Sequence, residues 1–144
     1  YRGHNVTEIN LEKLLSELIS KIKNAYNMFN NITIIQDIQN VLINPKLSFP
    51  VGIIINELVN NAYKYAFDEK NRGKIEISAK LKDKNLIEIK VEDNGKGINE
   101  EYLEGKTSTF GLNLIKSIAE LYNGKFSILN ENGTKATASL LMEE

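Results

Sequence analysis

Two short segments in the middle of the chain place apolar side chains at every second position. Residues 74–81 and 87–91 both follow this alternation, with charged or polar residues between the apolar ones. The Asp-Lys-Asn sequence at residues 83–85 predicts a turn, and therefore an antiparallel hairpin with one buried and one solvated face. A sheet of this kind buries its apolar face against helices, so the alternation predicts a two-layer α+β sandwich. The apolar positions are Ile75, Ile77, Ala79, Leu81, Ile87, Ile89 and Val91.

Apolar residues at helical spacing predict three helices elsewhere in the chain. The first follows Asn10, a favourable N-cap, and extends to about residue 26. The second is expected to be capped by Ser48, with a proline in its first turn, and to continue through residue 67. The third is predicted over residues 111–122 and is expected to end through the glycine of the Asn-Gly pair that follows. Further strands are predicted at residues 32–38, 126–129 and 136–141.

The composition suits a soluble globular domain and excludes several other classes of protein. The chain has 144 residues, 42% hydrophobic and 26% charged, which is enough for one domain with a core and argues against disorder. Its net charge of −1 offers no basic excess for nucleic acid or an anionic membrane surface. The absence of cysteine excludes disulfides and thiolate metal sites. No apolar run is long enough to span a membrane, so we expect a cytoplasmic domain, whether or not a longer parent protein is membrane-anchored.

Three polar residues line up on one face of the second predicted helix. At 100° per residue, Asn61 lies about 40° to one side of Glu57 and Lys64 about 20° to the other, away from an apolar arc. A carboxylate can orient or deprotonate a nucleophile, an amide oxygen suits Mg²⁺, and a lysine can neutralise phosphate oxygens. The alternative interpretation is a solvated helix surface with ordinary side-chain contacts.

Two glycine-containing loops favour a ligand site further along the chain. Gly95 and Gly97 let the backbone turn sharply after Asp93, whose carboxylate can accept a hydrogen bond from an exocyclic amine. The same residues are also typical of a plain turn. Gly111 opens the third helix, whose N-terminus can attract phosphate, although it can equally start a core helix. Neither G-x-x-x-x-G-K-[ST] nor G-x-G-x-x-G occurs, so a nucleotide would be bound by another scheme.

Four segments in this order resemble the motifs of the GHKL ATPases, the superfamily of gyrase, a heat-shock chaperone, histidine kinases and mismatch-repair ATPases. They are Glu-Leu-Val-Asn-Asn-Ala-Tyr-Lys-Tyr at 57–65, Asp-Asn-Gly-Lys-Gly at 93–97, Phe-Gly-Leu-Asn-Leu at 110–114 and Asn-Gly-Thr at 132–134. Residues 49–67 are most similar to sensor histidine kinases of the subfamily with Asn-Glu-Leu in the first motif. The resemblance covers nearly the whole chain and implies the GHKL fold, in which three helices pack on one face of a mixed sheet.

The resemblance also implies a role for each matching residue. Asn61 would bind the Mg²⁺ that bridges the phosphates of ATP, and Glu57 and Lys64 would be catalytic, with Glu57 activating or orienting the attacking group. Asp93 would accept the adenine amino group, and residues 99–110 would form a mobile lid. The nucleotide-binding residues implied in this way are Asn61, Lys64, Tyr65, Asp93, Gly95, Gly97, Ile98, Thr109, Phe110, Gly111, Leu112 and Thr134.

The sequence departs from the family pattern in places. Many histidine kinases carry Asn where Glu57 stands, and residues 107–109 are Thr-Ser-Thr where the family usually has more glycine. The only histidine, His4, lies in a polar leader without an amphipathic helix around it. We therefore expect residues 1–9 to be a leader or linker from an upstream dimerisation segment that carries the phosphoacceptor histidine. Residues 10–144 are expected to form a single ATP-binding catalytic domain.

The resemblance thus implies the catalytic domain of a sensor histidine kinase in two-component signal transduction. It would bind Mg·ATP and supply the γ-phosphoryl group to a histidine on that separate segment, with a response regulator as the downstream partner. Nucleic acid and direct membrane contact are not expected, and the isolated fragment is expected to be monomeric. Two alternatives stay open: an anti-sigma-factor-type serine kinase, and a nucleotide-sensing or scaffolding domain that has lost its activity.

Overall fold

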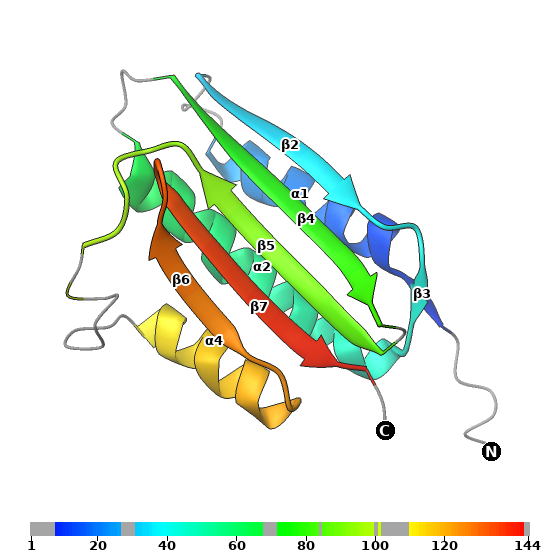
Figure 1. Cartoon of the computed structure of the whole chain (residues 1–144). Coiled ribbons are helices and arrows are strands. Elements are labelled where there is room, and N and C mark those ends of the chain that lie inside the picture. The colour runs from blue at the N-terminus through cyan, green and yellow to red at the C-terminus, as the bar shows by residue number, and fades with distance from the viewer. Residues whose placement is uncertain are drawn as a thin grey trace, which may run out of the picture.

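The computed structural model describes residues 8–26, 31–67, 72–83, 85–99, 101 and 110–142. Within these residues, five strands form one mixed sheet in the order β2-β4-β5-β7-β6 (Figure 1). Strand β2 is parallel to β4, and all other neighbours in this sheet are antiparallel. The strands are β2 (Ile32–Ile38), β4 (Gly73–Lys82), β5 (Leu86–Asp93), β6 (Phe126–Asn130) and β7 (Thr134–Leu141).

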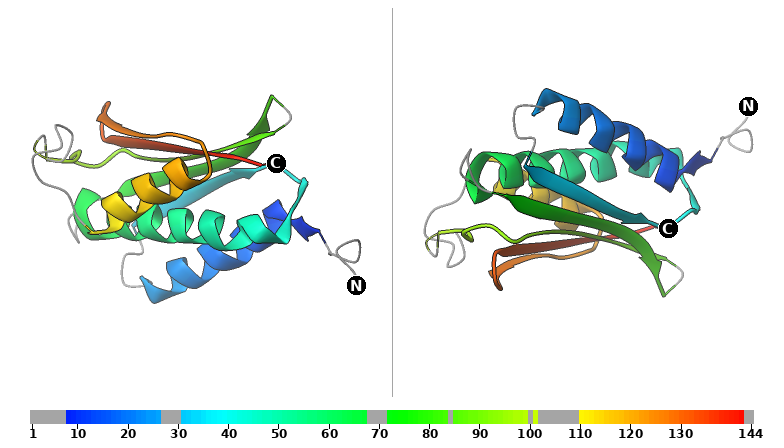
Figure 2. Two further views of the ribbon diagram at one scale, coloured as in Figure 1. Left: turned by 90° about the horizontal axis from the view of Figure 1, so that it is seen from below. Right: turned by 90° about the horizontal axis from the view of Figure 1, so that it is seen from above.

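Three long helices cover one face of this sheet (Figure 2), which confirms the predicted two-layer sandwich. Helix α1 (Leu11–Ala25) begins at its predicted cap, because the side chain of Asn10 accepts a 2.8 Å hydrogen bond from the N–H of Lys13. In the described part of the chain, no helix is long and apolar enough to cross a membrane. The remaining elements are α1 (Leu11–Ala25), α2 (Ser48–Asn61), α4 (Phe110–Leu121), the π-helix η3 (Ala62–Ala66), the 3-10 helix η2 (Pro45–Leu47), and the paired strands β1 (Ile9–Asn10) and β3 (Leu42–Ile43).

The core lies between the apolar face of the sheet and the facing sides of the helices. The alternating positions of the predicted hairpin are buried, except Leu81, which is half-buried. Helix α1 contributes Leu15 and Ile19, and α2 contributes Ile54 and Ile55, all fully buried. The apolar residues at strand spacing and those at helical spacing therefore pack together in a single layer.

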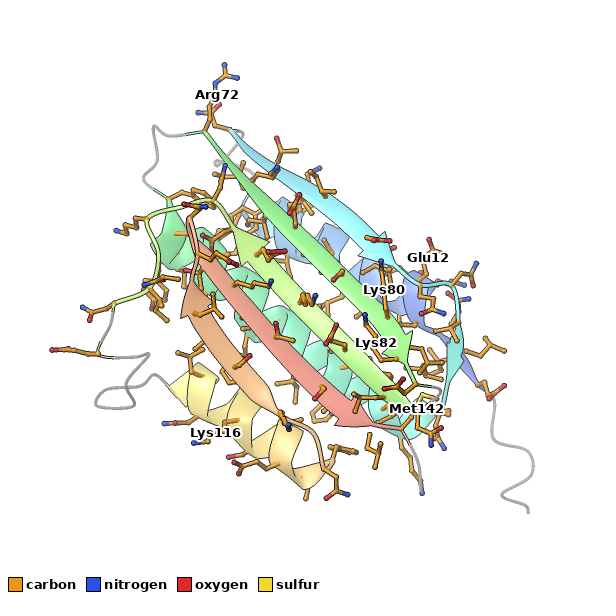
Figure 3. All side chains as sticks on the ribbon, viewed as in Figure 1. Glu12, Arg72, Lys80, Lys82, Lys116 and Met142 are labelled. Atoms are coloured by element: carbon orange, nitrogen blue, oxygen red, sulfur yellow. The ribbon has the colours of Figure 1, made fainter. Side chains whose placement is uncertain are left out.

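The opposite face of the sheet carries charged side chains (Figure 3). Lys80 pairs with Asp37 of β2 at 2.7 Å, and Lys82 pairs with Glu88 of β5 at 3.7 Å. Exposed ion pairs of this kind contribute at most about 1 kcal/mol each. The sheet is therefore stabilised mainly by burial on its helical side.

Two helix ends differ from the sequence prediction. Ser48 does not cap α2, because its hydroxyl donates a 2.7 Å hydrogen bond back to the carbonyl of Pro45 in η2. At the end of α4, Asn123 rather than Gly124 takes the left-handed conformation, with a φ of 59°. The N–H of Gly124 then donates to the carbonyl of Ala119 at 2.7 Å, which closes the last turn.

Candidate functional site

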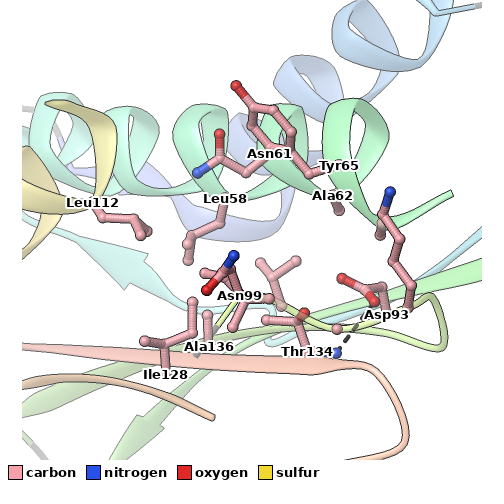
Figure 4. A pocket seen from close by; sticks show the side chains of 15 residues that line it. Leu58, Asn61, Ala62, Tyr65, Asp93, Asn99, Leu112, Ile128, Thr134 and Ala136 are labelled. Carbon is pink, nitrogen blue, oxygen red and sulfur yellow. Dashed lines mark hydrogen bonds between the residues drawn. The ribbon is translucent and has the colours of Figure 1, made fainter. Parts of the chain in front are cut away.

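A cavity of about 320 Å³ opens between the ends of α2 and η3, the start of α4, and strands β5, β6 and β7 (Figure 4). Its volume lies in the range of small-molecule binding sites. The walls are largely apolar, and a few polar side chains reach the cavity from the helices and from the loop after β5. The larger apolar side chains in the walls are Leu58, Val91, Ile98, Leu112 and Ile128.

Asp93, the last residue of β5, supplies the only carboxylate among the described residues that line the cavity. Its Oδ1 accepts hydrogen bonds from the N–H of Gly95 at 2.9 Å and from the N–H of Thr134 at 3.2 Å. No described residue donates a hydrogen bond to the second oxygen, Oδ2. Burial raises the pKa of the Asp93 carboxyl, although the two N–H donors act in the opposite direction. The site thus offers an acceptor oxygen in an apolar cavity, which can receive the amino group of a planar base.

The loop after β5 forms one wall of the cavity and is tied to two neighbouring elements. The side chain of Asn94 accepts a 2.8 Å hydrogen bond from the N–H of Lys74 on β4. The N–H of Lys96 donates to the carbonyl of Ala66, at the end of η3, at 3.0 Å. Gly95 does not line the cavity, but a side chain there would overlap the carbonyl of Ala66. Glycine is therefore required for the loop to approach η3 so closely.

The helical side of the cavity is formed where α2 changes into the π-helix η3. Asn61 and Tyr65 line the cavity together with the apolar residues Leu58 and Ala62 of the same helical segment. Glu57 and Lys64 do not line it. The apolar arc therefore contributes to both the core and the cavity, and of the three aligned polar residues only Asn61 lines the cavity. Single π-turns of this kind are frequent at functional sites.

Aromatic and polar contacts join η3 and the last turn of α2 to Tyr26 at the end of α1. The ring of Tyr63 stacks on that of Tyr26, with centroids 4.5 Å apart and planes inclined by 4°. The Tyr26 hydroxyl donates to Oδ1 of Asn60 at 2.7 Å, and Nδ2 of Asn60 donates to the carbonyl of Asn56 at 2.6 Å. Burial, together with the neighbouring Tyr26, raises the pKa of Tyr63. These contacts hold in place the turn that presents Asn61.

A Tyr26→Phe variant is expected to lower the free energy of unfolding by about 1 kcal/mol. The substitution removes the hydrogen bond to Asn60 and keeps the stacked ring. Urea denaturation followed by circular dichroism measures the change. The matched control is Tyr65→Phe, because that side chain is 58% exposed and its stability contribution is expected to be near zero. Equal losses in the two variants would contradict the assignment.

The cavity brings together predicted residues that are far apart in the sequence. Gly95, Gly111 and Lys64 lie outside its lining. Thr109 lies outside the described residues, as do the side chain of Phe110 and most of the predicted lid. The predicted residues that line the cavity are Asn61, Tyr65, Asp93, Gly97, Ile98, Leu112 and Thr134.

The sequence analysis did not name eight further lining residues as nucleotide-binding: Leu58, Ala62, Ala66, Val91, Lys96, Asn99, Ile128 and Ala136. Ile128 and Ala136 belong to the predicted final hairpin, so the alternation along its strands was the signal that could have found them. Lys96 and Asn99 follow the predicted glycines, where only the path of the loop decides which side chains reach the cavity. Such a path depends on the distant partners of the loop rather than on local sequence.

The residues present fit a purine nucleotide with its divalent cation. Asp93 and the apolar walls suit the base. The side-chain amide of Asn61 makes no hydrogen bond to another described residue, and its oxygen is a hard ligand suited to Mg²⁺, which keeps most of its shell as water and phosphate. Among the residues that the structure covers, no three His, Cys, Asp or Glu side chains gather into a metal site.

Comparison with known proteins identifies a family. The model of the histidine kinase-, DNA gyrase B-, and HSP90-like ATPases matches residues 48–144. No curated protein sequence matches the chain.

Several solved structures share the fold at low sequence identity. The catalytic domain of the histidine kinase ThkA is similar with a TM-score of 0.74 and 24% identity, over 94% of this chain and 96% of that one. The ATP binding domain of PrrB from Mycobacterium tuberculosis gives 0.72 and 20%, over 96% and 98%. The blue-light activated histidine kinase of Erythrobacter litoralis gives 0.81 and 17%, over 93% of this chain. The chain spans 42% of that kinase and 61% of its separate histidine kinase domain.

Proposed function

Since the chain belongs to the family of histidine kinase-, DNA gyrase B-, and HSP90-like ATPases, we propose that it binds Mg·ATP and supplies the γ-phosphoryl group to a histidine. The carboxylate of Asp93 carries this proposal. One of its oxygens is held by two main-chain N–H groups, and the other is left for a ligand in an apolar cavity of suitable volume. An acceptor-only group in that position selects adenine, whose exocyclic amine donates, over guanine, which presents a carbonyl oxygen there.

The remaining roles follow from the distance of each residue to the cavity along α2 and η3. Asn61 would supply its amide oxygen to Mg²⁺, and the bound cation would neutralise charge on the phosphates. Glu57 and Lys64 each lie within about one helical turn of Asn61, so we assign them to the transferred phosphate. We assign Tyr65 to the ribose. Catalysis would then consist mostly of positioning and charge neutralisation, as phosphoryl transfer generally requires.

The proposal extends to the longer protein in which such a domain works. We propose that residues 10–144 are the catalytic domain and that residues 1–9 link it to a dimerisation segment with the acceptor histidine. A response regulator would then receive the phosphoryl group. The solved structures with this fold that carry the name histidine kinase support this choice among the members of the family. The Asn-Glu-Leu motif before Val59 supports the proposed subfamily.

Calorimetric titration with a non-hydrolysable ATP analogue, with and without Mg²⁺, tests the proposal. The wild-type chain is expected to bind the analogue, and Mg²⁺ to tighten binding. An Asn61→Ala variant is expected to lose about tenfold in affinity with Mg²⁺ and to match the wild type without it, because only the metal contact is removed. Asn31→Ala is the matched control, since Asn31 is exposed and does not line the cavity.

Absence of saturable heat for the wild-type chain, together with no displacement of a fluorescent nucleotide, would refute nucleotide binding. If the nucleotide binds, phosphoryl transfer is tested by adding a purified dimerisation segment with its histidine, and separately an anti-anti-sigma protein. Labelled phosphate on the histidine segment alone is the expected result. Label on a serine of the anti-anti-sigma protein would favour the serine kinase instead.

A further inference from the structure

We propose that Asn130 is a positioning residue that holds one wall of the nucleotide cavity by clamping the main chain of Ile98. The inference rests on the proposed function, because the wall in question would contact the nucleotide. Oδ1 of Asn130 accepts a hydrogen bond from the N–H of Ile98 at 2.7 Å. Its Nδ2 donates to the carbonyl of the same residue at 2.8 Å. One side chain thus satisfies both main-chain groups of a residue 32 positions away.

The position of Asn130 in the sheet explains why it can do this. Asn130 ends β6, next to the turn into β7. Side chains on a strand share a face at every second position, so Asn130 continues the face from which Ile128 reaches the cavity. A primary amide carries one donor group and one acceptor, like a main-chain unit, and can therefore replace a missing strand partner. Strand β5 has already ended at Asp93, so Ile98 has no ladder partner of its own.

The clamp is the second of two attachments that hold this part of the loop. The first is the hydrogen bond from Lys96 to the end of η3. Between the two attachments the chain turns at Gly97, which has a φ of 84°. A Cβ atom at Gly97 would lie 2.9 Å from Oδ1 of Asn130, so the turn and the amide are closely packed. Gly97, Ile98 and Asn99 all line the cavity, and Asn130 itself does not. Asn130 therefore affects nucleotide binding only through the position of the cavity residues that it holds in place.

Loss of the clamp would leave the N–H and carbonyl of Ile98 to water and free the wall to move outward. Asn130 is exposed, so its replacement leaves the core intact. The Asn130→Ala variant removes both hydrogen bonds. The Asn130→Asp variant keeps the shape and the acceptor for the N–H, but it places a carboxylate oxygen against the carbonyl of Ile98. Ser127→Ala, on the same strand and exposed, is the matched control.

Three measurements on the whole chain test the proposal: amide hydrogen exchange resolved by NMR, affinity for an ATP analogue, and thermal unfolding. In the Asn130→Ala variant, exchange of the Ile98 amide is expected to accelerate about tenfold or more, while core amides of β5 keep their rates. The Asn130→Asp variant keeps the acceptor for this N–H, so a smaller acceleration is expected there. Affinity for the analogue is expected to fall about tenfold, the effect of two modest hydrogen bonds. Ser127→Ala is expected to match the wild type in all three measurements.

If the Ile98 amide of the Asn130→Ala variant exchanges at the wild-type rate, the clamp is overturned. Faster exchange at every core amide of this variant would overturn it as well. Wild-type nucleotide affinity in Asn130→Ala, despite faster exchange at Ile98, would overturn the positioning role. The failure of the clamp and the failure of the proposed function are distinguishable. If the wild-type chain binds no adenine nucleotide, the proposed function fails and the positioning role fails with it. The exchange measurement still decides whether Asn130 clamps Ile98.

Discussion

An Asp93→Asn variant is expected to bind ATP about a hundredfold more weakly than the wild-type chain, although its fold stays intact. The asparagine keeps an oxygen for the N–H groups of Gly95 and Thr134, which Oδ1 accepts at 2.9 and 3.2 Å. It replaces the second carboxylate oxygen by an NH₂ group, which faces the amino group of adenine with a donor instead of an acceptor. Calorimetric titration of both chains with ATP and GTP measures the effect, and the preference for ATP over GTP should shrink or reverse.

The same variant is expected to unfold at a higher temperature than the wild type at neutral pH. Burial raises the pKa of Asp93 in the folded chain, so the folded state binds this proton more tightly than the unfolded state does. The wild type therefore loses stability as the pH rises from the ordinary aspartate range through the raised pKa, and stays at this lower level above it. Asparagine does not titrate, so the difference between the melting temperatures should vanish in acid.

Two results would count against this account of Asp93. Unchanged affinity for ATP in Asp93→Asn would show that the carboxylate does not contact the base. A lower melting temperature at neutral pH would show that its charge stabilises the fold and is not an electrostatic cost there. Wild-type binding combined with a higher melting temperature would retain the electrostatic argument and refute only the contact with adenine.

A Gly133→Ala variant is expected to lose on the order of 4 kcal/mol of unfolding free energy. Gly133 has a φ of 129°, which L-residues rarely adopt, and a Cβ atom there would overlap the carbonyl of Asp93. The obstacle is main chain at the end of the β5–β7 ladder, where Asp93 pairs with Thr134, so it cannot move aside as a flexible side chain can. Since the stability of a domain is about 5–15 kcal/mol, much of it would be lost. Urea denaturation measures the change.

Gly52→Ala is the matched control, with the opposite expected sign. Gly52 lies within α2, and a Cβ atom there would meet only Cδ2 of Leu18, at 3.9 Å, an ordinary contact. Alanine is favoured over glycine inside a helix by about 1 kcal/mol, so this variant should be stabilised by roughly that amount. Destabilisation of similar size in both variants would mean that the close approach at Gly133 is not the cause.

The elements of the fold could be predicted because their signals are local. Alternation over residues 74–81 and 87–91, and the helical spacing after Asn10, extend over one element each, and burial of one face is enough to specify them. The helix ends were less predictable. The hydroxyl of Ser48 donates to the carbonyl of Pro45 instead of capping α2. Gly124 is needed at its position because a side chain there would overlap the main chain of β7. Neither contact follows from the residue type alone.

By itself, the sequence determined the layers of the fold and the order of motifs that identified the family. The tertiary structure decided which residues of those motifs share one cavity. It placed Thr134 on the carboxylate of Asp93, 41 positions away, and Asn130 on Ile98, 32 positions away. It also brought Asn61, the last residue of α2, to the cavity and left Glu57 outside the lining. The physical reason is the separation along the chain of the residues that interact. Periodicity and capping depend on near neighbours, whereas a hydrogen bond between distant segments forms only once the sheet has aligned them.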